Sequence, residues 1–182
     1  MCIRDRDRRE SGISFIPEDR QSQGLLMDVS LSENVILGKQ SSSKYKSRYS
    51  NIKFGEADKN SNTVIENFDV RTPGNETLAL ALSGGNQQKF VVGREIENKP
   101  QLLIASQPTR GIDIGAQSLI WNKLRLARDH GLGVLLISAD LDELIGLSDR
   151  LYVIYEGNLV KELDPENATP EILGSYMTGI KS

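Results

Sequence analysis

The chain contains 182 residues, of which 22 are Lys or Arg and 25 are Asp or Glu, so its formal net charge is −3. This near balance gives no support to binding of nucleic acid or acidic membranes through a bulk positive charge. The shares of hydrophobic residues (38%) and charged residues (26%) are typical of a globular domain and exclude disorder throughout the chain.

The counts of cysteine and histidine exclude two kinds of site. Cys2 is the only cysteine and His130 the only histidine, so the chain can form neither an internal disulfide nor a zinc cluster of its own. This composition favours a reducing compartment. No apolar run approaches the ~18 residues that cross a bilayer, and the charged residues 1–6 do not resemble a signal peptide.

The first ten residues, MCIRDRDRRE, repeat Arg and Asp without hydrophobic periodicity. We expect residues 1–10 to be either a frayed charged tail or a non-native start left by truncation or a sequence-end artefact. Residues 12–17 then show the pattern of a short strand that ends at a proline.

The next segment combines a helix start with a basic loop. Ser30 and Glu33 form a capping-box pattern, which predicts a helix that continues to about Leu37. Residues 39–53 carry five basic residues and no acidic one. A solvated loop and a nucleic-acid patch both fit this composition, and the scarcity of aromatic residues favours the solvated loop.

Helices and strands alternate in the rest of the chain. Apolar periodicity and turn residues predict helices over about residues 54–68, 83–98, 115–130, from 140 and from 169, strands over 102–105 and 134–137, and a hairpin over 150–160. The two strands are continuous apolar runs of the kind that is buried in a parallel sheet. This order predicts an α/β fold with a mainly parallel sheet.

The start of the helix after Leu82 carries the clearest chemical signal. Ser83, Gly84 and Gly85 place a hydroxyl and two residues without side chains where a helix presents unpaired N–H groups. Such a start suits a phosphate, because the N–H groups and the helix dipole both favour negative charge. A plain serine cap with flexible glycines is the alternative interpretation of these three residues.

The longer segment resembles a known family. Leu82 to Lys89, with the sequence LSGGNQQK, resembles the signature motif of ATP-binding-cassette (ABC) transporter ATPases, in the form found in importers of simple sugars and nucleosides. Four further segments resemble motifs of that family: the Walker B strand (102–106), the D-loop (108–113), the switch-histidine segment (135–140) and the Q-loop stretch of the second cassette of tandem-cassette importers (12–20). Residues 105–111 lean toward the nucleoside-uptake branch.

The resemblance, over about residues 8–178, implies a fold and a domain plan. The fold would be the ABC ATPase core of the P-loop NTPase type, with a mainly parallel sheet and a helical subdomain of about residues 28–98. That subdomain would be inserted into an α/β core of residues 11–27 and 99–178. The phosphate-cradling loop of the family, Gly-x-x-x-x-Gly-Lys-Ser/Thr, does not occur in the sequence. We therefore expect the C-terminal part of a second, degenerate cassette, truncated before the P-loop strand and helix.

The catalytic positions depart from the family pattern. Ser106 and Gln107 stand where the family has the Asp that holds Mg²⁺ and the Glu that polarises the attacking water. Ala139 stands at the switch histidine and Glu18 at the Q-loop glutamine. No catalytic residue is intact, so we expect the chain alone to be inactive. His130, at a predicted helix end, is expected to stabilise that end rather than to act in chemistry.

The resemblance implies a role within a pair of cassettes. Ser83, Gly84, Gly85 and Gln87 would contact ATP held by a partner cassette, and Asp113 of the D-loop would bridge the two. ATP and Mg²⁺ would be the cofactors of the assembled dimer, and no metal site is expected in this chain itself.

The expected partners are another cassette of the same full-length polypeptide, transmembrane permease subunits and, indirectly, a substrate-binding protein, but no nucleic acid. The implied location is the cytoplasm, peripheral on the inner face of the cell membrane. Two alternatives remain: a non-transport ABC ATPase associated with nucleic acid, and a scaffold remnant that no longer meets nucleotide.

Overall fold

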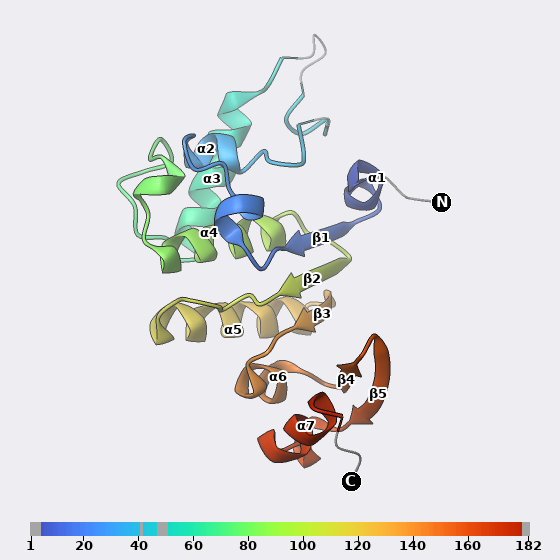
Figure 1. The fold of residues 1–182 in the computed structure, drawn as a ribbon. Helices are drawn as coiled ribbons and strands as arrows, with labels where there is room; N and C mark the ends of the chain where they lie inside the picture. Colours follow the sequence, from blue (N-terminus) through green and yellow to red (C-terminus); the bar gives the residue numbers. More distant parts are fainter. Residues whose placement is uncertain (1–4, 41, 47–50, 180–182) are drawn as a thin grey trace. The chain divides into compact units, whose positions relative to one another are not determined.

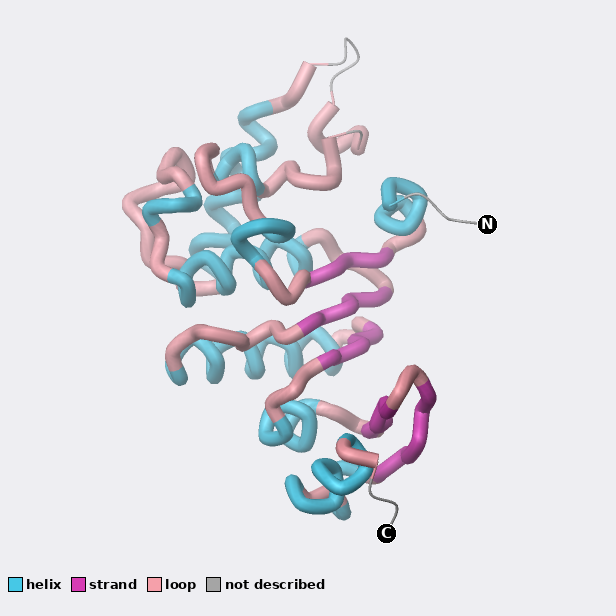
Figure 2. The backbone as a smooth tube through the Cα atoms, in the orientation of Figure 1, coloured by secondary structure: helices cyan, strands magenta, loops and turns pink. Residues whose placement is uncertain are grey.

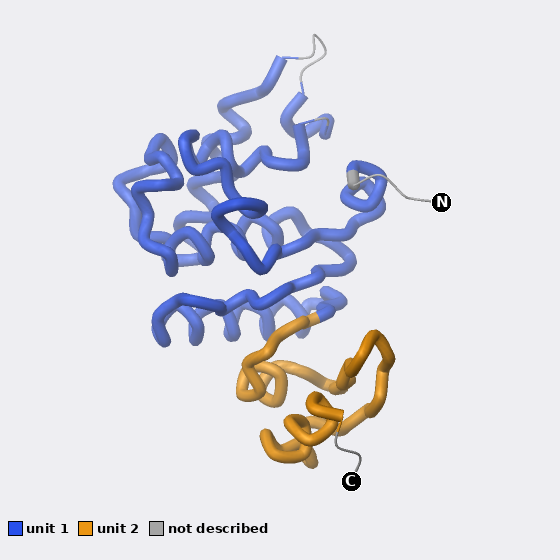
Figure 3. The backbone as a smooth tube through the Cα atoms, in the orientation of Figure 1, with its two compact units in different colours: residues 1–135 blue, residues 136–182 orange. Residues whose placement is uncertain are grey.

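The computed structural model describes residues 5–40, 42–46 and 51–179, and the chain divides into two compact units. Unit 1 comprises residues 1–135 and unit 2 residues 136–182 (Figure 3). The helices expected between residues 28 and 98 all belong to unit 1, together with the first two strands.

Unit 1 is a small parallel sheet with helices before and between its strands. Its elements, shown in Figure 1, are α1 (Asp5–Glu10), β1 (Ile13–Ile16), α2 (Leu31–Asn34), α3 (Phe54–Asn67), α4 (Gly84–Glu97), β2 (Leu102–Ser106), α5 (Ile114–Asp129) and β3 (Gly133–Ile137), whose last two residues fall in unit 2. The helices and strands follow the predicted order, which confirms the α/β prediction.

The sheet has the strand order β1-β2-β3 (Figure 2). β1 and β2 are parallel, in a register that pairs Ile13 with Leu102 and Ile16 with Ala105. This confirms the predicted parallel sheet. The prediction of a second buried strand is wrong for β3, where Leu135 is 51% exposed. β3 is the outermost strand of this sheet, so a neighbouring strand covers it on one side only.

The start of the described chain is helical, which differs from the frayed segment expected for residues 1–10. α1 is followed by a turn in which the Gly12 N–H donates to the Arg9 carbonyl over 3.1 Å. The Arg9 guanidinium lies 3.4 Å from a carboxylate oxygen of Glu95, a residue with no exposed surface. This long-range ion pair holds α1 beside the core. Local hydrophobic periodicity does not predict such a contact.

The capping box predicted at residue 30 is present. The Ser30 hydroxyl accepts from the Glu33 N–H, and the Glu33 carboxylate accepts from the Ser30 N–H, which starts α2. The basic loop that follows is described at residues 39, 40, 42–46 and 51–53, whereas residues 47–50 lie outside the described part. Tyr45 departs from the expected solvated loop, because it is only 1% exposed.

Helix α4 is the central element of unit 1. Ten of its residues are buried, including Phe90, Val91 and Val92. Its buried polar side chains have partners, as buried charges require. Arg94 donates to Gly24 O over 2.9 Å and pairs with Glu95. Packing and these polar contacts therefore hold α4, and with it the position of its N-terminal end.

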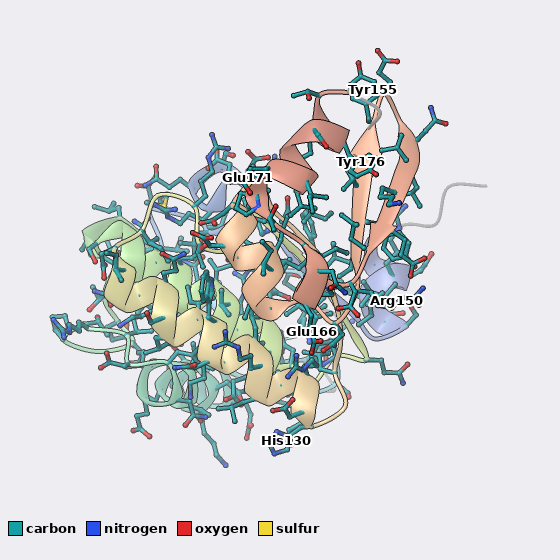
Figure 4. The ribbon with its side chains drawn as sticks, turned by 90° about the horizontal axis from the view of Figure 1, so that it is seen from below. His130, Arg150, Tyr155, Glu166, Glu171 and Tyr176 are labelled. Carbon is teal, nitrogen blue, oxygen red and sulfur yellow. The ribbon has the colours of Figure 1, made fainter. Side chains whose placement is uncertain are left out.

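Unit 2 is a hairpin packed on helices. Its elements are α6 (Leu141–Leu147), β4 (Leu151–Tyr155), β5 (Asn158–Leu163) and α7 (Pro170–Met177). Both turn residues between the strands, Glu156 and Gly157, have positive φ (47° and 78°), as a two-residue hairpin turn requires. Lys161 of β5 lies 5.4 Å from the ring centre of Tyr176 on α7, and both strands and helix appear in Figure 4. A small core of Leu151, Val153, Ala168 and Leu173 completes the unit.

None of the helices in the described ranges combines the length with the apolar character that a membrane crossing needs.

Candidate functional site

A cavity opens at the carboxyl ends of β1 and β2. Parallel strands bring their carboxyl ends to one edge of a sheet, and ligands of α/β proteins bind outside that edge. The cavity has a volume of about 680 Å³ and is lined by Phe15, Glu18, Asp19, Arg20, Gln21, Gln23, Ser106, Arg110 and Gly111. Two residues predicted from the motifs, Glu18 and Ser106, therefore meet in one cavity.

The carboxylates of this cavity are committed to neighbouring groups. Glu18 forms an ion pair with Arg110, and both side chains are more than half exposed. Asp19 accepts from the N–H groups of Gln21 and Ser22 at 3.0 and 3.1 Å and so caps one turn of π-helix, Arg20–Gly24. Hydrogen bonds from Ser22 hold the pKa of Asp19 below its usual value. Both carboxylates therefore already have partners within the chain.

The end of β2 carries no carboxylate at all. Ser106 is the last residue of the strand, and Gln107 follows with a φ of 50°, a left-handed conformation that is uncommon outside glycine. Such backbone strain is typical of functional turns. Neither side chain supplies the carboxylate through which proteins usually bind Mg²⁺ beside a phosphate. Across the residues that the structure describes, no three His, Cys, Asp or Glu side chains are grouped as metal ligands.

Arg20 links this cavity to the start of α4. Its Nη1 donates to the Arg110 carbonyl over 3.1 Å. Its Nη2 lies so close to Gly84 that a Cβ built there would be 2.6 Å away. Its Nε is buried and makes no hydrogen bond to any described residue. Gly84 thus leaves room where the guanidinium passes, and sequence reasoning, which treated Arg20 only as part of a motif, missed this contact.

The signature serine and the D-loop aspartate each cap a helix. The exposed Ser83 is the N-cap of α4, and its hydroxyl accepts from the Asn86 N–H. Asp113 is the N-cap of α5, and its carboxylate accepts from the Ala116 N–H over 2.9 Å. That backbone hydrogen bond is the main reason why the pKa of Asp113 is lowered. Both side chains thus occupy helix starts with spare N–H groups.

The two helix starts lie against each other. A Cβ built on Gly85 would lie 2.9 Å from the Asp113 carboxylate and 3.3 Å from the Ala116 side chain. Only glycine leaves room for this approach. In addition, the buried side chain of Gln88 donates to the Pro108 carbonyl over 2.7 Å. The signature and D-loop segments, predicted separately, therefore form one rigid corner of unit 1.

Gln87 lies inside the protein rather than toward solvent. Its side chain is 3% exposed and donates to the carbonyls of Ala79 and Leu82 at 3.1 and 3.2 Å. Its amide oxygen accepts from Gln21 over 3.2 Å. The nucleotide contact expected of Gln87 has no support in this arrangement, in which Gln87 holds the residues just before Ser83. Gln88 was missed because a glutamine in a helix gives no sequence signal of burial.

Two further predicted positions are Ala139 and His130. Ala139 belongs to unit 2 and is exposed, directly before Asp140, the N-cap of α6. His130 is the residue after α5, as its label in Figure 4 shows, and its Nδ1 lies 2.6 Å from the Leu126 carbonyl. That contact agrees with the expected role at a helix end.

No family model matches the chain. Curated relatives do: it is 47% identical over 173 residues to the guanosine import ATP-binding protein NupO of Bacillus subtilis, a match that covers 93% of this chain and 33% of the relative. Its curated homologues are therefore ATP-binding proteins of ABC importers. The chain is also 41% identical to the nucleoside import ATP-binding protein NupA of Lactococcus lactis, with 97% of this chain and 35% of NupA covered. The cassette thus spans about a third of the length of these relatives.

The fold of the cassette is found in solved structures as well. A nucleotide-free ATP-binding cassette from an ABC transporter matches 96% of this chain and 72% of its own, with a TM-score of 0.73 and 20% identity. A dimeric cassette in a post-hydrolysis state bound to ADP and Pi matches 88% of this chain and 65% of its own, with a TM-score of 0.70 and 21% identity. These matches establish the ABC ATPase fold that the motifs predict.

Proposed function

We propose that the chain is part of the ATP-binding subunit of an importer for nucleosides or simple sugars. In this role its signature corner contacts ATP held by the P-loop of a partner cassette, while its own composite site binds nucleotide without hydrolysing it. The relatives support the importer class, since two of them are described by their names as guanosine and nucleoside import ATP-binding proteins.

The signature corner carries the proposal. Ser83 is exposed and Gly84 only partly buried at the start of the fourteen-residue helix α4, whereas Gly85 is buried. Backbone N–H groups and the helix dipole at such a start bind phosphate oxygens. Asp113, which lies against Gly85, places the D-loop carboxylate at the same corner. The corner can therefore contact phosphate without the catalytic carboxylates that this chain lacks.

The end of β2 supports the second half of the proposal. Hydrolysis of ATP needs a group that takes up or orients the proton of the attacking water. Gln107 can orient water but cannot accept its proton, and Ala139 cannot hydrogen-bond through its side chain. General-base help is worth about 10²–10⁴ in rate, so the composite site lined by Gln107 is expected to be inactive.

The remaining partners follow from this class. We propose that ATP is bound by both composite sites and that Mg²⁺ acts at the site whose P-loop belongs to the partner cassette. Transmembrane permease subunits and a substrate-binding protein complete the importer. The chain would act in the cytoplasm at the inner face of the membrane.

A serine substitution in the full-length importer ATPase tests the proposal. Ser83→Arg fills the start of α4 with a long cation and is expected to reduce both ATPase activity and solute uptake at least about 100-fold, in line with the loss of a catalytic contact. Asn62→Arg, an exposed polar residue on α3, is the matched control and should leave both rates unchanged. Unchanged rates in Ser83→Arg would refute the proposal, and loss of ATPase stimulation by nucleic acid instead of uptake would favour the non-transport alternative.

A further inference from the structure

The basic loop that follows α2 has a defined structure at its base. Residues 39–53 carry five basic residues and no acidic one, and Lys46 pairs with Ile52 in an antiparallel bridge. The Lys53 N–H donates to the Tyr45 carbonyl over 2.8 Å, which joins the same two segments next to the bridge. Tyr45 is only 1% exposed, and the Lys53 ammonium donates to the Ser43 carbonyl over 3.0 Å. These contacts fix both arms of the loop to the body of unit 1.

Four exposed side chains on and next to these arms form what we call the basic patch: Lys44, Lys46, Ile52 and Phe54. Ile52 is 41% exposed and Phe54 is 54% exposed. In the described part of the chain neither lysine forms an ion pair, and the next acidic residue in the sequence is Glu56, in the first turn of α3. Because Lys46 and Ile52 are directly paired, their side chains lie on one face of the bridge. The patch therefore combines positive charge without an acidic partner and exposed apolar surface.

This combination indicates an anionic lipid surface as the partner. Protein surfaces that lie in the membrane interface combine Lys or Arg with apolar and aromatic side chains, and each basic residue near an anionic leaflet strengthens binding about fivefold. The chain as a whole has a net charge of −3, so the attraction has to be local to the patch. Single-stranded nucleic acid also attracts basic residues, but it binds aromatic rings by stacking and offers no apolar phase to Ile52. The exposed aliphatic side chain therefore favours lipid.

We propose that the basic patch binds the anionic headgroups of the membrane directly, with Ile52 and Phe54 inserted among them. This inference goes beyond the proposed function, in which the chain reaches the membrane only through permease subunits. A lipid contact on unit 1 is a second attachment that does not depend on ATP. It would hold the subunit at the membrane surface before it assembles with the permease.

Vesicle binding by the full-length importer ATPase, purified without its permease and without nucleotide, tests the inference by sedimentation. Vesicles of phosphatidylcholine and phosphatidylglycerol in equal parts should bind at least about tenfold more tightly than vesicles of phosphatidylcholine alone, and added salt should weaken this binding because the charges are exposed. The double variant Lys44→Gln/Lys46→Gln should bind the mixed vesicles at least about tenfold more weakly. Its matched control is Lys99→Gln/Lys161→Gln, which changes two exposed lysines outside the patch and should alter the affinity less than about threefold.

The apolar half of the patch is tested by a separate substitution. Phe54→Ser removes the exposed ring and should weaken binding to the mixed vesicles at least about fivefold, at high salt as well as at low salt, because salt does not screen apolar burial. Leu126→Ser on α5 is the matched control, since Leu126 is 53% exposed and Phe54 54%, and it should leave the affinity unchanged. Circular dichroism melting of each variant reports whether it folds. Lys46→Gln alone, which should lose about fivefold in affinity, replaces a double variant that does not fold.

Three outcomes would overturn the inference. The first is equal affinity for neutral and mixed vesicles, and the second is an unchanged affinity in the folded lysine variant. The third is binding of mixed-sequence single-stranded DNA that is tighter than binding of mixed vesicles and is lost in the same variant, because it would assign the patch to nucleic acid. The vesicle assay contains neither ATP nor permease, so its outcome is independent of the Ser83→Arg experiment and the two proposals fail separately.

Discussion

The start of α4 and the end of β2 lie in the same unit but differ in what they need to function. The signature corner works through backbone N–H groups, a serine and two glycines, all of which are present. The end of β2 needs carboxylates, and Ser106 and Gln107 provide none. Contacts made by backbone N–H groups persist when side chains are substituted, whereas contacts made by carboxylates are lost. A cassette can therefore lose its own chemistry and still serve its partner.

After Ser83→Arg, the largest effect is expected from a side chain placed inside the signature corner. Gly85→Val in the full-length protein would bring a branched side chain against Asp113 and Ala116, which already lie 2.9 and 3.3 Å from an added Cβ. We expect ATPase activity to fall at least about tenfold and the free energy of unfolding to fall by about 1–3 kcal/mol, as for overpacking.

The matched control for that variant is a glycine with open space around it. Gly174 on α7 has no atom within 4 Å of an added Cβ. Gly174→Ala should leave ATPase activity unchanged and raise the free energy of unfolding by up to about 1 kcal/mol, because alanine favours helix more than glycine does. Equal effects of the two substitutions in activity assays and urea denaturation would show that the signature corner is not special.

The connection between the two regions can be weakened on its own. Gln88→Ala removes the hydrogen bond to the Pro108 carbonyl and leaves that buried acceptor unsatisfied. We expect the free energy of unfolding to fall by about 1–3 kcal/mol, measured by urea denaturation. Gln88→Glu keeps the shape but loses the donor, and it should be at least as destabilising. A stable Gln88→Ala variant would mean that the two motifs are positioned independently.

The partly buried amine of Lys39 makes the stability of the protein depend on pH. Burial lowers the pKa of Lys39 from 10.5 to about 8, against an opposing contribution from Glu95, while Arg9, Lys44 and Arg94 add to the lowering. Between pH 8 and 10.5 the unfolded chain binds more protons at this residue than the folded chain does, so its contribution to stability rises with pH. Lys39→Met should remove that rise from a series of denaturation curves, and an unchanged slope would contradict the assignment.

The smallest effect is expected at the end of β2. Gln107→Glu alone restores the general base but neither the metal ligand at Ser106 nor the switch residue at Ala139. We expect the ATPase rate of the full-length protein to change less than about twofold in a steady-state assay. A tenfold increase would mean that this site was held inactive by one residue only.

The sequence predicted local features well because their causes are local. The capping box at Ser30, the cap at Ser83 and the hairpin expected over 150–160 depend on residues within a few positions of one another. The motif positions that resemble the family also fell on the expected elements. These are the features that single-chain patterns encode.

Contacts between distant segments were not predictable in the same way. Arg20 meets Gly84, and Arg9 meets Glu95, across long stretches of chain that no periodicity connects. For the same reason the burial of Gln87 and Gln88 and the exposure of Leu135 appeared only in the structure. Burial depends on which helices and strands pack together. Periodicity predicts the helices and strands themselves but not their packing partners.

The central claim is that this chain serves a partner's ATP while its own composite site does not hydrolyse nucleotide. Single-turnover analysis of the full-length protein loaded with two ATP molecules tests it most directly, by counting ADP and ATP after acid quench. The account predicts one ADP and one intact ATP per polypeptide, and no ADP in the Ser83→Arg variant. Two ADP molecules per polypeptide, or an unchanged yield in Ser83→Arg, would contradict it.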